Sequence, residues 1–319
     1  MPRGVRRIPQ KCATAVGKPN SASTQGQFYV REDITVTAGL RLDARRDIHA
    51  EGLTPRLAFV WRAHEQHLVK VQYSEGFRAP TFFELFGLSR QGNFDLDFET
   101  IGTTELSYVY RDLKRTARAT LFNSEVKNMI FPFGSGVDPP PPEPPDGPPP
   151  PEGEGGEEQP APPPPPPPAG FMNIARAESR GFELEWEQQL NDRFKWSANL
   201  SYVDSEDNRT ANGEKVTPAG MAKWMANLKF VSRPRRNLLF TSHLYHVGER
   251  VTERGGVDGY DSLDLSLSAF HLGAKGLTVR ASIKNALDDR VRYLLSLPTG
   301  TAVNIHDGRT WWLQLGYEL

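Results

Sequence analysis

Several features that mark common protein classes are scarce in this 319-residue sequence. No apolar run approaches the roughly 20 residues that a membrane-spanning helix needs. The single cysteine, Cys12, excludes an intrachain disulfide and argues against a cysteine-based zinc site. The formal net charge is only −1, so the chain has no general attraction to nucleic acid.

The N-terminus also lacks the mark of an exported protein. Residues 1–7 are basic, but no apolar core of about 7–15 residues follows, so we expect no secretory signal peptide in the sequence as given. Residues 1–25 are polar and rich in Ser, Thr, Lys and Pro, and we expect them to be disordered.

From Gly26 onward the sequence does contain a strong pattern, a hydrophobic period of two. Near the C-terminus, for example, Leu277, Val279, Ala281 and Ile283 alternate with Thr278, Arg280, Ser282 and Lys284. Such alternation predicts strands with one apolar and one polar face. The mean hydropathy of −0.53 is compatible with a membrane barrel, because only every second residue of a barrel strand must be apolar.

About thirteen segments carry this alternation. They are residues 26–33, 35–43, 53–62, 67–76, 101–111, 115–130, 173–188, 194–204, 219–231, 236–248, 259–269, 277–285 and 309–319. Most have about ten residues, the length with which a tilted strand crosses a bilayer. Strands of soluble proteins are usually nearer five or six residues.

The predicted connections alternate between short turns and long links. The long links cover residues 44–52, 77–100, 131–172, 205–218, 249–258 and 286–308. Outer-membrane barrels have short periplasmic turns and long extracellular loops, so the rhythm predicts such a barrel. Within one long link, residues 138–168 are almost entirely Pro, Gly and Glu, and we expect a disordered surface insert there.

Five short motifs lie in order along these segments. They are Phe77-Arg78-Ala79-Pro80, Asn93-Phe94-Asp95-Leu96, Ser179-Arg180-Gly181-Phe182-Glu183, Asn285-Ala286-Leu287-Asp288 and Gly308-Arg309-Thr310. In that order they resemble the FRAP, NPxL, SRGxE, NLFD and GRT boxes of TonB-dependent outer-membrane receptors. The resemblance covers residues 26–319. Phe94 departs from the usual proline, and Leu319 stands where the family prefers a terminal aromatic residue.

The resemblance implies an all-β fold, an antiparallel transmembrane β-barrel with long extracellular loops in the outer membrane. About 13 of the family's roughly 22 strands are present. The plug domain, the TonB-contacting box and the first strands have no counterpart in the sequence. Since an open edge in lipid leaves backbone groups unpaired, we expect the chain to be a fragment of a receptor or a non-functional truncated gene product.

The resemblance also implies uptake of a scarce, bulky ligand, typically an iron–siderophore complex. The implied partners are that ligand, outer-membrane lipid and a TonB-like energy-coupling protein that acts through the missing plug. No cofactor, metal site or nucleic-acid partner is expected. Loop aromatics and arginines suit capture of such a ligand. The candidates are Arg78, Phe82, Phe83, Phe86 and Arg90. For Arg78 we favour a structural role, as an arginine near a strand end that bonds loop carbonyls.

Two alternative functions remain open. A passive porin or a structural outer-membrane barrel would share the alternation and the loop rhythm, but it would lack the motifs around Arg78, Gly181 and Arg309. An outer-membrane hydrolase is disfavoured, because the sequence has no G-x-S-x-G and no histidine–glutamate zinc motif. The resemblance also disfavours haem uptake, because haem receptors of that family carry a histidine between the first two motifs and this sequence has none between Pro80 and Asn93.

Overall fold

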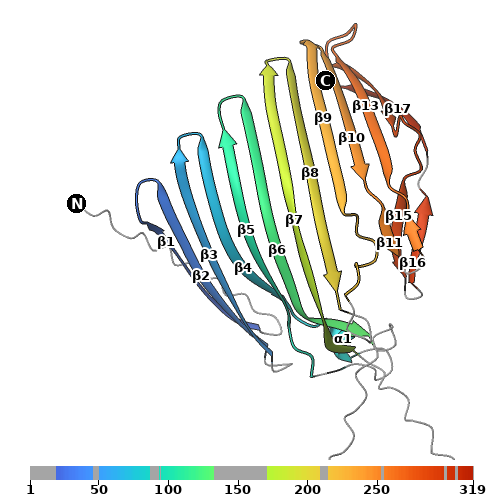
Figure 1. The fold of residues 1–319 in the computed structure, drawn as a ribbon. Helices are drawn as coiled ribbons and strands as arrows, with labels where there is room; N and C mark the ends of the chain where they lie inside the picture. The colour runs from blue at the N-terminus through green and yellow to red at the C-terminus, as the bar shows by residue number, and fades with distance from the viewer. Residues whose placement is uncertain are drawn as a thin grey trace, which may run out of the picture.

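Long antiparallel strands form most of the part of the chain that the computed structural model describes. The described residues are 19–45, 50–86, 93, 95–132, 171–208, 215–252, 255–297, 300–305 and 308–318. Thirteen strands make one sheet, and each pairs with its neighbours in chain order (Figure 1). The predicted number of strands and their antiparallel pairing are therefore confirmed.

The strands of this sheet are mostly longer than ten residues. They are β1 (Pro19–Tyr29), β2 (Ile34–Arg45), β3 (Ala50–His64), β4 (His67–Arg78), β5 (Glu99–Arg111), β6 (Arg115–Pro132), β7 (Phe171–Asn191), β8 (Phe194–Asp207), β9 (Trp224–Arg235), β10 (Leu238–Val247), β13 (Tyr260–Phe270), β14 (Leu277–Lys284) and β17 (Thr310–Tyr317). The connections add the helix α1 (Phe82–Phe86) and two small hairpins, β11 (Arg250–Thr252) with β12 (Gly255–Val257) and β15 (Arg292–Leu297) with β16 (Gly300–Ile305). The hydrophobic pattern of the sequence did not predict these three elements.

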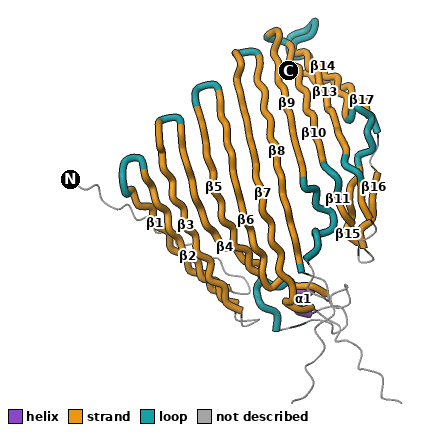
Figure 2. The backbone as a smooth tube through the Cα atoms, viewed as in Figure 1, coloured by secondary structure: helices purple, strands orange, loops and turns teal. Residues whose placement is uncertain are grey.

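The sheet is broad, curved and open. Strands β1 and β17 form its two edges and do not pair with each other in the described structure. Short turns join the strands at one end, and helix α1 and both hairpins lie toward the other (Figure 2). We call these the short-turn end and the long-loop end.

One face of the sheet is apolar across its whole width. The strand registers align one apolar residue per strand from β1 to β9, in the order Phe28, Val36, Phe59, Val71, Leu106, Leu121, Phe182, Tyr202 and Trp224. The same face continues through Leu265, Ile283 and Trp311 on the last three strands. A continuous exposed apolar face of this width suits contact with lipid.

Aromatic side chains lie at two levels on this apolar face. Trp186 and Trp196 stack near the short-turn end, with ring centroids 6.2 Å apart. Tyr202 contacts Trp224 nearer the long-loop end, at 4.6 Å. Along β8, from Trp196 to Tyr202, the two levels lie about 20 Å apart at the usual rise of a strand. This spacing is compatible with the aromatic girdles of an outer-membrane barrel.

The opposite face is polar and hollowed. The registers align Lys70, Ser107, Thr120, Glu183 and Ser201 across five strands of this face. A hollow lies over this row and is lined by its first four members. Hydroxyl pairs link neighbouring strands on the same face, namely Thr103–Ser124, Ser107–Thr120, Ser179–Ser205 and Ser266–Ser282 at 2.7–3.1 Å. The polar residues therefore face the concave side, as the alternation predicts.

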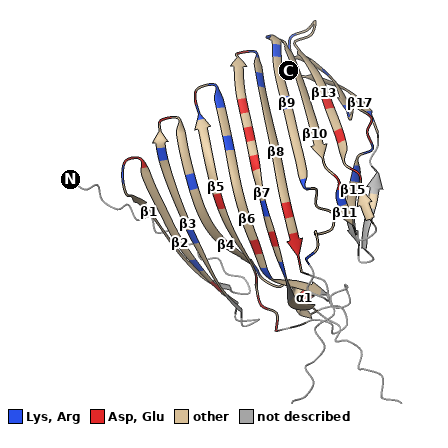
Figure 3. Cartoon of the chain, viewed as in Figure 1, with Lys and Arg blue, Asp and Glu red and all other residues tan. Residues whose placement is uncertain are grey.

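Charged residues recur along the strands rather than only at their ends (Figure 3). On the polar face, Arg118 of β6 forms an ion pair with Glu185 of β7 at 3.3 Å. Near the C-terminus, Arg280 lies on this face and its Nε donates to Ser268 Oγ at 3.0 Å. The neighbouring Val279 lies on the apolar face with Leu315. The placement of Arg280 and Val279 confirms the predicted assignment of the two faces.

Several boundary predictions are wrong. The strand predicted at residues 219–231 is β9, which occupies Trp224–Arg235 and so includes the turn predicted at Ser232–Arg235. Strand β1 begins at Pro19, within the segment 1–25 that was expected to be disordered, because pairing with β2 satisfies its backbone without apolar side chains. The link between β2 and β3 spans only residues 46–49, because both strands extend into the predicted loop and Arg45 pairs with Ala50. Residues 1–18 and the insert 138–168 lie outside the described residues. Among the described residues, no helix has the length and apolarity to cross a membrane.

Candidate functional site

The predicted capture segment lies at the long-loop end, between β4 and β5. Residues 79–98, which we call the β4–β5 loop, contain helix α1. The described part of this loop is held to the sheet by ion pairs, by hydrogen bonds and by a small apolar core. These contacts decide which of its side chains remain available to a ligand.

Arg78 organises the start of the loop. Its Nη1 and Nη2 each donate to a different carboxylate oxygen of Glu84, both at 3.0 Å. Its Nε donates to Glu99 on β5. The other oxygen of Glu99 accepts the backbone N–H of Ile130 on β6 at 2.7 Å. Arg78 thus joins the loop to two strands through carboxylates, whereas the sequence analysis expected it to bond loop carbonyls.

Glu84 also caps the helix that carries the phenylalanines. One of its oxygens accepts the backbone N–H of Thr81 at 2.6 Å, and the Thr81 hydroxyl accepts the backbone N–H of Glu84 at 3.2 Å. This reciprocal pair is a capping box. Burial disfavours the charged carboxylate, but the hydrogen bonds from Arg78 and Thr81 outweigh burial and hold the pKa of Glu84 below its usual range.

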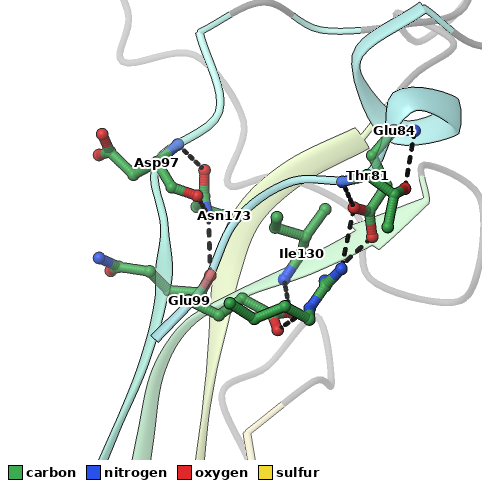
Figure 4. A network of polar contacts seen from close by, with 8 residues as sticks. Thr81, Glu84, Asp97, Glu99, Ile130 and Asn173 are labelled. Atoms are coloured by element: carbon green, nitrogen blue, oxygen red, sulfur yellow. Dashed lines mark hydrogen bonds and ion pairs between the residues drawn. The ribbon is translucent and has the colours of Figure 1, made fainter. Parts of the chain in front are cut away.

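Asn173 and Asn93 fasten the second half of the loop, and Figure 4 shows the contact of Asn173 with Asp97. The side-chain oxygen of Asn173 accepts the backbone N–H of Asp97 at 2.8 Å, and its amide donates to the carbonyl of Asp97. The same amide donates to the carbonyl of Asn128 at 2.7 Å. Asn93 donates to the carbonyl of Phe171 at 2.8 Å. The loop is therefore tied to β6 and β7, which lie far from it in sequence.

A small apolar core lies beneath the loop. Leu85 and Phe98 are buried, and Phe77 and Ala79 pack against them. The rings of Phe77 and Phe98 stack with centroids 4.7 Å apart. Leu96 is the largest fully buried side chain among the described residues. The motif residues Phe77, Ala79 and Leu96 therefore contribute packing, while Pro80 is buried where the strand leads into the helix.

The three phenylalanines of α1 point outward from this core. Phe82, Phe83 and Phe86 are 76%, 51% and 44% exposed. The rings of Phe82 and Phe86 stack at 4.2 Å, and Phe83 makes an edge contact with Phe171 at 5.6 Å. The structure thus brings these predicted residues together as one exposed aromatic cluster. Arg90 lies outside the described residues.

The third motif belongs to the wall of the sheet. A Cβ on Gly181 would lie 2.0 Å from the carbonyl oxygen of Tyr202 and 2.8 Å from the ring of Phe122. Phe122 and Gly181 are directly paired across β6 and β7. Only glycine allows this close approach. Glu183, two residues later, lines the hollow of the polar face.

The last two motifs form one unit before the final strand. The Asp288 Oδ1 accepts the backbone N–H of Arg309 at 2.7 Å, and Asp288 takes a φ of 61°. Asn285 is buried, and its amide donates to the carbonyl of Asp289 at 2.8 Å. The backbone N–H groups of Asp261 and Arg290 hold the pKa of Asp289 below its usual range. Gly308 lies against Asp288, where a Cβ would meet Oδ1 at 2.6 Å.

The site also depends on residues that the sequence analysis did not identify. Asn173 lies 76 positions from its partner Asp97, and no local pattern indicates that contact. Glu84 had a local signal, because a threonine followed three residues later by glutamate is the pattern of a capping box. In the described part of the chain, no group of three or more His, Cys, Asp or Glu side chains has an arrangement that suits a metal ion.

Comparison with known families identifies this barrel wall. The model of the TonB-dependent receptor-like β-barrel matches residues 10–286. The chain belongs to the TonB-dependent receptor family. Members of this family are outer-membrane receptors and transporters rather than enzymes, as predicted. A search of curated proteins returned no significant match.

Solved structures of such receptors share the fold. The ferric enterobactin receptor PfeA of Pseudomonas aeruginosa, in complex with BCV-L6, superposes with a TM-score of 0.69 at 19% identity over 93% of this chain and 45% of its own. The siderophore receptor PirA of Pseudomonas aeruginosa gives 0.61 at 19%, covering 93% and 46%. The FrpB iron transporter of Neisseria meningitidis gives 0.66 at 16%, covering 93% and 44%. The chain thus spans less than half the length of each of these structures.

Proposed function

We propose that the chain forms part of the wall and the capture surface of an outer-membrane receptor for a bulky iron–siderophore complex. The observation that carries this proposal is the exposed aromatic cluster of Phe82, Phe83 and Phe86 on a loop that is otherwise tightly fastened. The family and the siderophore receptors among its structural neighbours support the same ligand class.

The cluster suits ligand capture for physical reasons. Contiguous exposed apolar groups on a protein surface usually mark a binding site, because water solvates them poorly. The ion pairs of Arg78 and the tether of Asn173 hold the cluster in place before a ligand arrives. A preorganised site loses less conformational entropy on binding than a mobile loop would.

The remaining steps of uptake are proposed for a receptor that also contains a plug domain. In such a receptor the polar concave face surrounds the plug, and a TonB-like protein transmits energy to the plug from the inner membrane. The apolar face, with its aligned row from Phe28 to Trp224, contacts outer-membrane lipid. We assign the described chain only to the wall and to capture.

The test is a binding measurement on a triple variant. The full chain, refolded in detergent, is titrated with a ferric tris-catecholate chelate and with a ferric tris-hydroxamate chelate, and tryptophan quenching is followed. Replacing Phe82, Phe83 and Arg90 with alanine should weaken binding of the chelate that the wild type prefers by tenfold or more, about 1.4 kcal/mol.

The matched control is Leu113→Ala, which removes a fully exposed apolar side chain at the short-turn end. This variant should bind the chelate like the wild type. Unchanged binding by the triple variant, combined with loss of its β-sheet circular dichroism, would show that the phenylalanines are packing elements. Failure of the wild type to bind either chelate would overturn the proposed ligand class.

A further inference from the structure

A second cluster lies at the long-loop end, on strands remote from the β4–β5 loop. Tyr245 of β10 and Tyr260 of β13 both lie on the polar face, and their rings meet at 6.0 Å. Val247 and Val291 pack with them, and Tyr260 is 6% exposed. The two phenols and the two valines therefore form a small apolar cluster with polar tips, at the end of the sheet where the β4–β5 loop also lies.

Arg250 lies against this cluster with few partners. It is only 7% exposed, and its guanidinium carbon lies 5.6 Å from the centroid of the Tyr260 ring. Its Nη2 donates to the carbonyl of Arg292 at 2.9 Å, but its Nε has no hydrogen-bond acceptor among the described residues. No carboxylate in the described part of the chain pairs with Arg250, which makes it unlike Arg78.

A buried guanidinium that has no carboxylate partner and one unpaired N–H donor favours the binding of an anion. Burial removes the water that would solvate the charge, and a single carbonyl with an aromatic face replaces that water only in part. The Nε–H also remains as an unsatisfied donor, which is unfavourable when buried. An anionic oxygen that reached this cluster would supply both the missing charge and the missing acceptor.

Arg292, whose backbone carbonyl accepts from Arg250, carries a second positive charge near this cluster. Its side chain is 20% exposed, and its ion pair is with Asp258 at 3.5 Å, a residue whose own side chain is 87% exposed. This ion pair is weakened because water screens the exposed carboxylate of Asp258. The Arg292 Nη1 also donates to the carbonyls of Gly259 and Arg290, both at 3.4 Å. Of the two arginines, Arg292 is therefore the more accessible and Arg250 the more buried.

We propose that Arg250 and Arg292, with Tyr245 and Tyr260, form a subsite for the anionic oxygens of the ligand. The chemical class that fits is an anionic chelate with catecholate or carboxylate donors, because two guanidinium groups complement negative oxygens and the tyrosine rings offer apolar contact to an aromatic ligand. This inference rests on the proposed function, and it adds the charge of the ligand and a second set of contact residues.

The test compares two chelates on the refolded full chain. An anionic ferric tris-catecholate and a neutral ferric tris-hydroxamate are titrated against the wild type, Arg250→Gln, Arg250→Lys and Arg292→Gln. Both glutamine variants should bind the tris-catecholate about tenfold more weakly, or about 1.4 kcal/mol, and the tris-hydroxamate with unchanged affinity. The lysine variant should keep most of the affinity for the anionic chelate because it keeps the charge.

The control is Arg280→Gln, which removes another arginine of the polar face that already donates to Ser268. It should bind both chelates like the wild type. Equal losses for both chelates in Arg250→Gln and Arg292→Gln, or no loss for either, would overturn the anionic subsite. If the wild type binds the tris-hydroxamate alone, the receptor function stands and only the anionic subsite fails. If it binds neither chelate, the proposed ligand class fails as well.

Discussion

The side chain of Asp288 holds the backbone of Arg309, with 2.7 Å between Oδ1 and the amide nitrogen. This bond links the turn after β14 to the residue before β17, across a connection that contains the β15–β16 hairpin. Two motifs that are 20 residues apart in the sequence thus form one structural unit. The bond between Asp288 and Arg309 thereby fixes the position at which β17 joins the sheet.

The first prediction concerns this link. Asp288→Ala removes the acceptor and places alanine at a φ of 61°, so we expect it to destabilise the end of the sheet by about 1–2 kcal/mol. Asp288→Asn keeps an oxygen acceptor and a residue that tolerates this conformation, and it should behave like the wild type. Urea unfolding in lipid vesicles measures both variants. Equal stability of Asp288→Ala and the wild type would show that the bond is dispensable.

The second prediction concerns the close contact at Gly181. Gly181→Ala places a Cβ 2.0 Å from the Tyr202 carbonyl oxygen, so β7 and β8 must move apart. We expect a loss of about 1–3 kcal/mol, as is typical of overpacking. The control is Gly316→Ala on β17, where a Cβ meets nothing within 4 Å. If both glycine variants lower the unfolding free energy equally, the loss reflects general strand effects rather than the contact with Tyr202.

The third prediction is a pH dependence of the β4–β5 loop. The pKa of Glu84 is lower in the folded protein than the ordinary value of about 4.3. Its stabilising contribution is therefore fully present above that ordinary value and is lost as the pH falls through the lower folded value. The loop is probed by limited proteolysis with an acid-active protease in the acidic range and a neutral protease near neutrality, and each rate is divided by that of an unfolded reference chain at the same pH. The normalised rate should rise over the acidic range and stay constant near neutral pH.

The matched variant for this experiment is Glu84→Gln. It removes the titrating group, so it should be cleaved faster than the wild type at neutral pH and should approach it at the acidic end. A wild-type loop whose cleavage responds to pH only above neutrality would contradict the assignment to Glu84. Such a response would show that a titratable group other than Glu84 controls cleavage of the loop.

The sheet was predictable from the sequence because the alternation of apolar and polar residues that specifies a strand is a local pattern. Alternation fixes which residues share a face, and thirteen alternating segments match the thirteen strands of the sheet. Strand ends were less predictable, as β1 shows, because backbone pairing also stabilises polar segments such as Ser21–Gln25. The hairpins β11–β12 and β15–β16 are too short for a periodic signal.

The candidate site was predictable only in part. The phenylalanines of α1 were predicted as candidates from the sequence, because contiguous exposed apolar residues usually mark a binding site. The partners of Arg78 depend on how the loop folds back on the sheet, and the contact between Asn173 and Asp97 depends on tertiary structure alone. The pairing of Arg250 with Tyr260 also had no local signal, because the two residues lie on separate elements.

The most direct test of the central claim places a fluorescent label on either face of two paired strands. In a Cys12→Ser background, single cysteines replace Leu106 or Leu121 on the apolar face, and Ser107 or Thr120 on the polar face. The labelled chain is reconstituted in vesicles, and a lipid-dissolved quencher is compared with a water-soluble one. Lipid-dissolved quencher should act several-fold more strongly on labels at 106 and 121, and water-soluble quencher on labels at 107 and 120. Equal quenching on both faces, or the reverse pattern, would contradict a membrane wall with a polar interior.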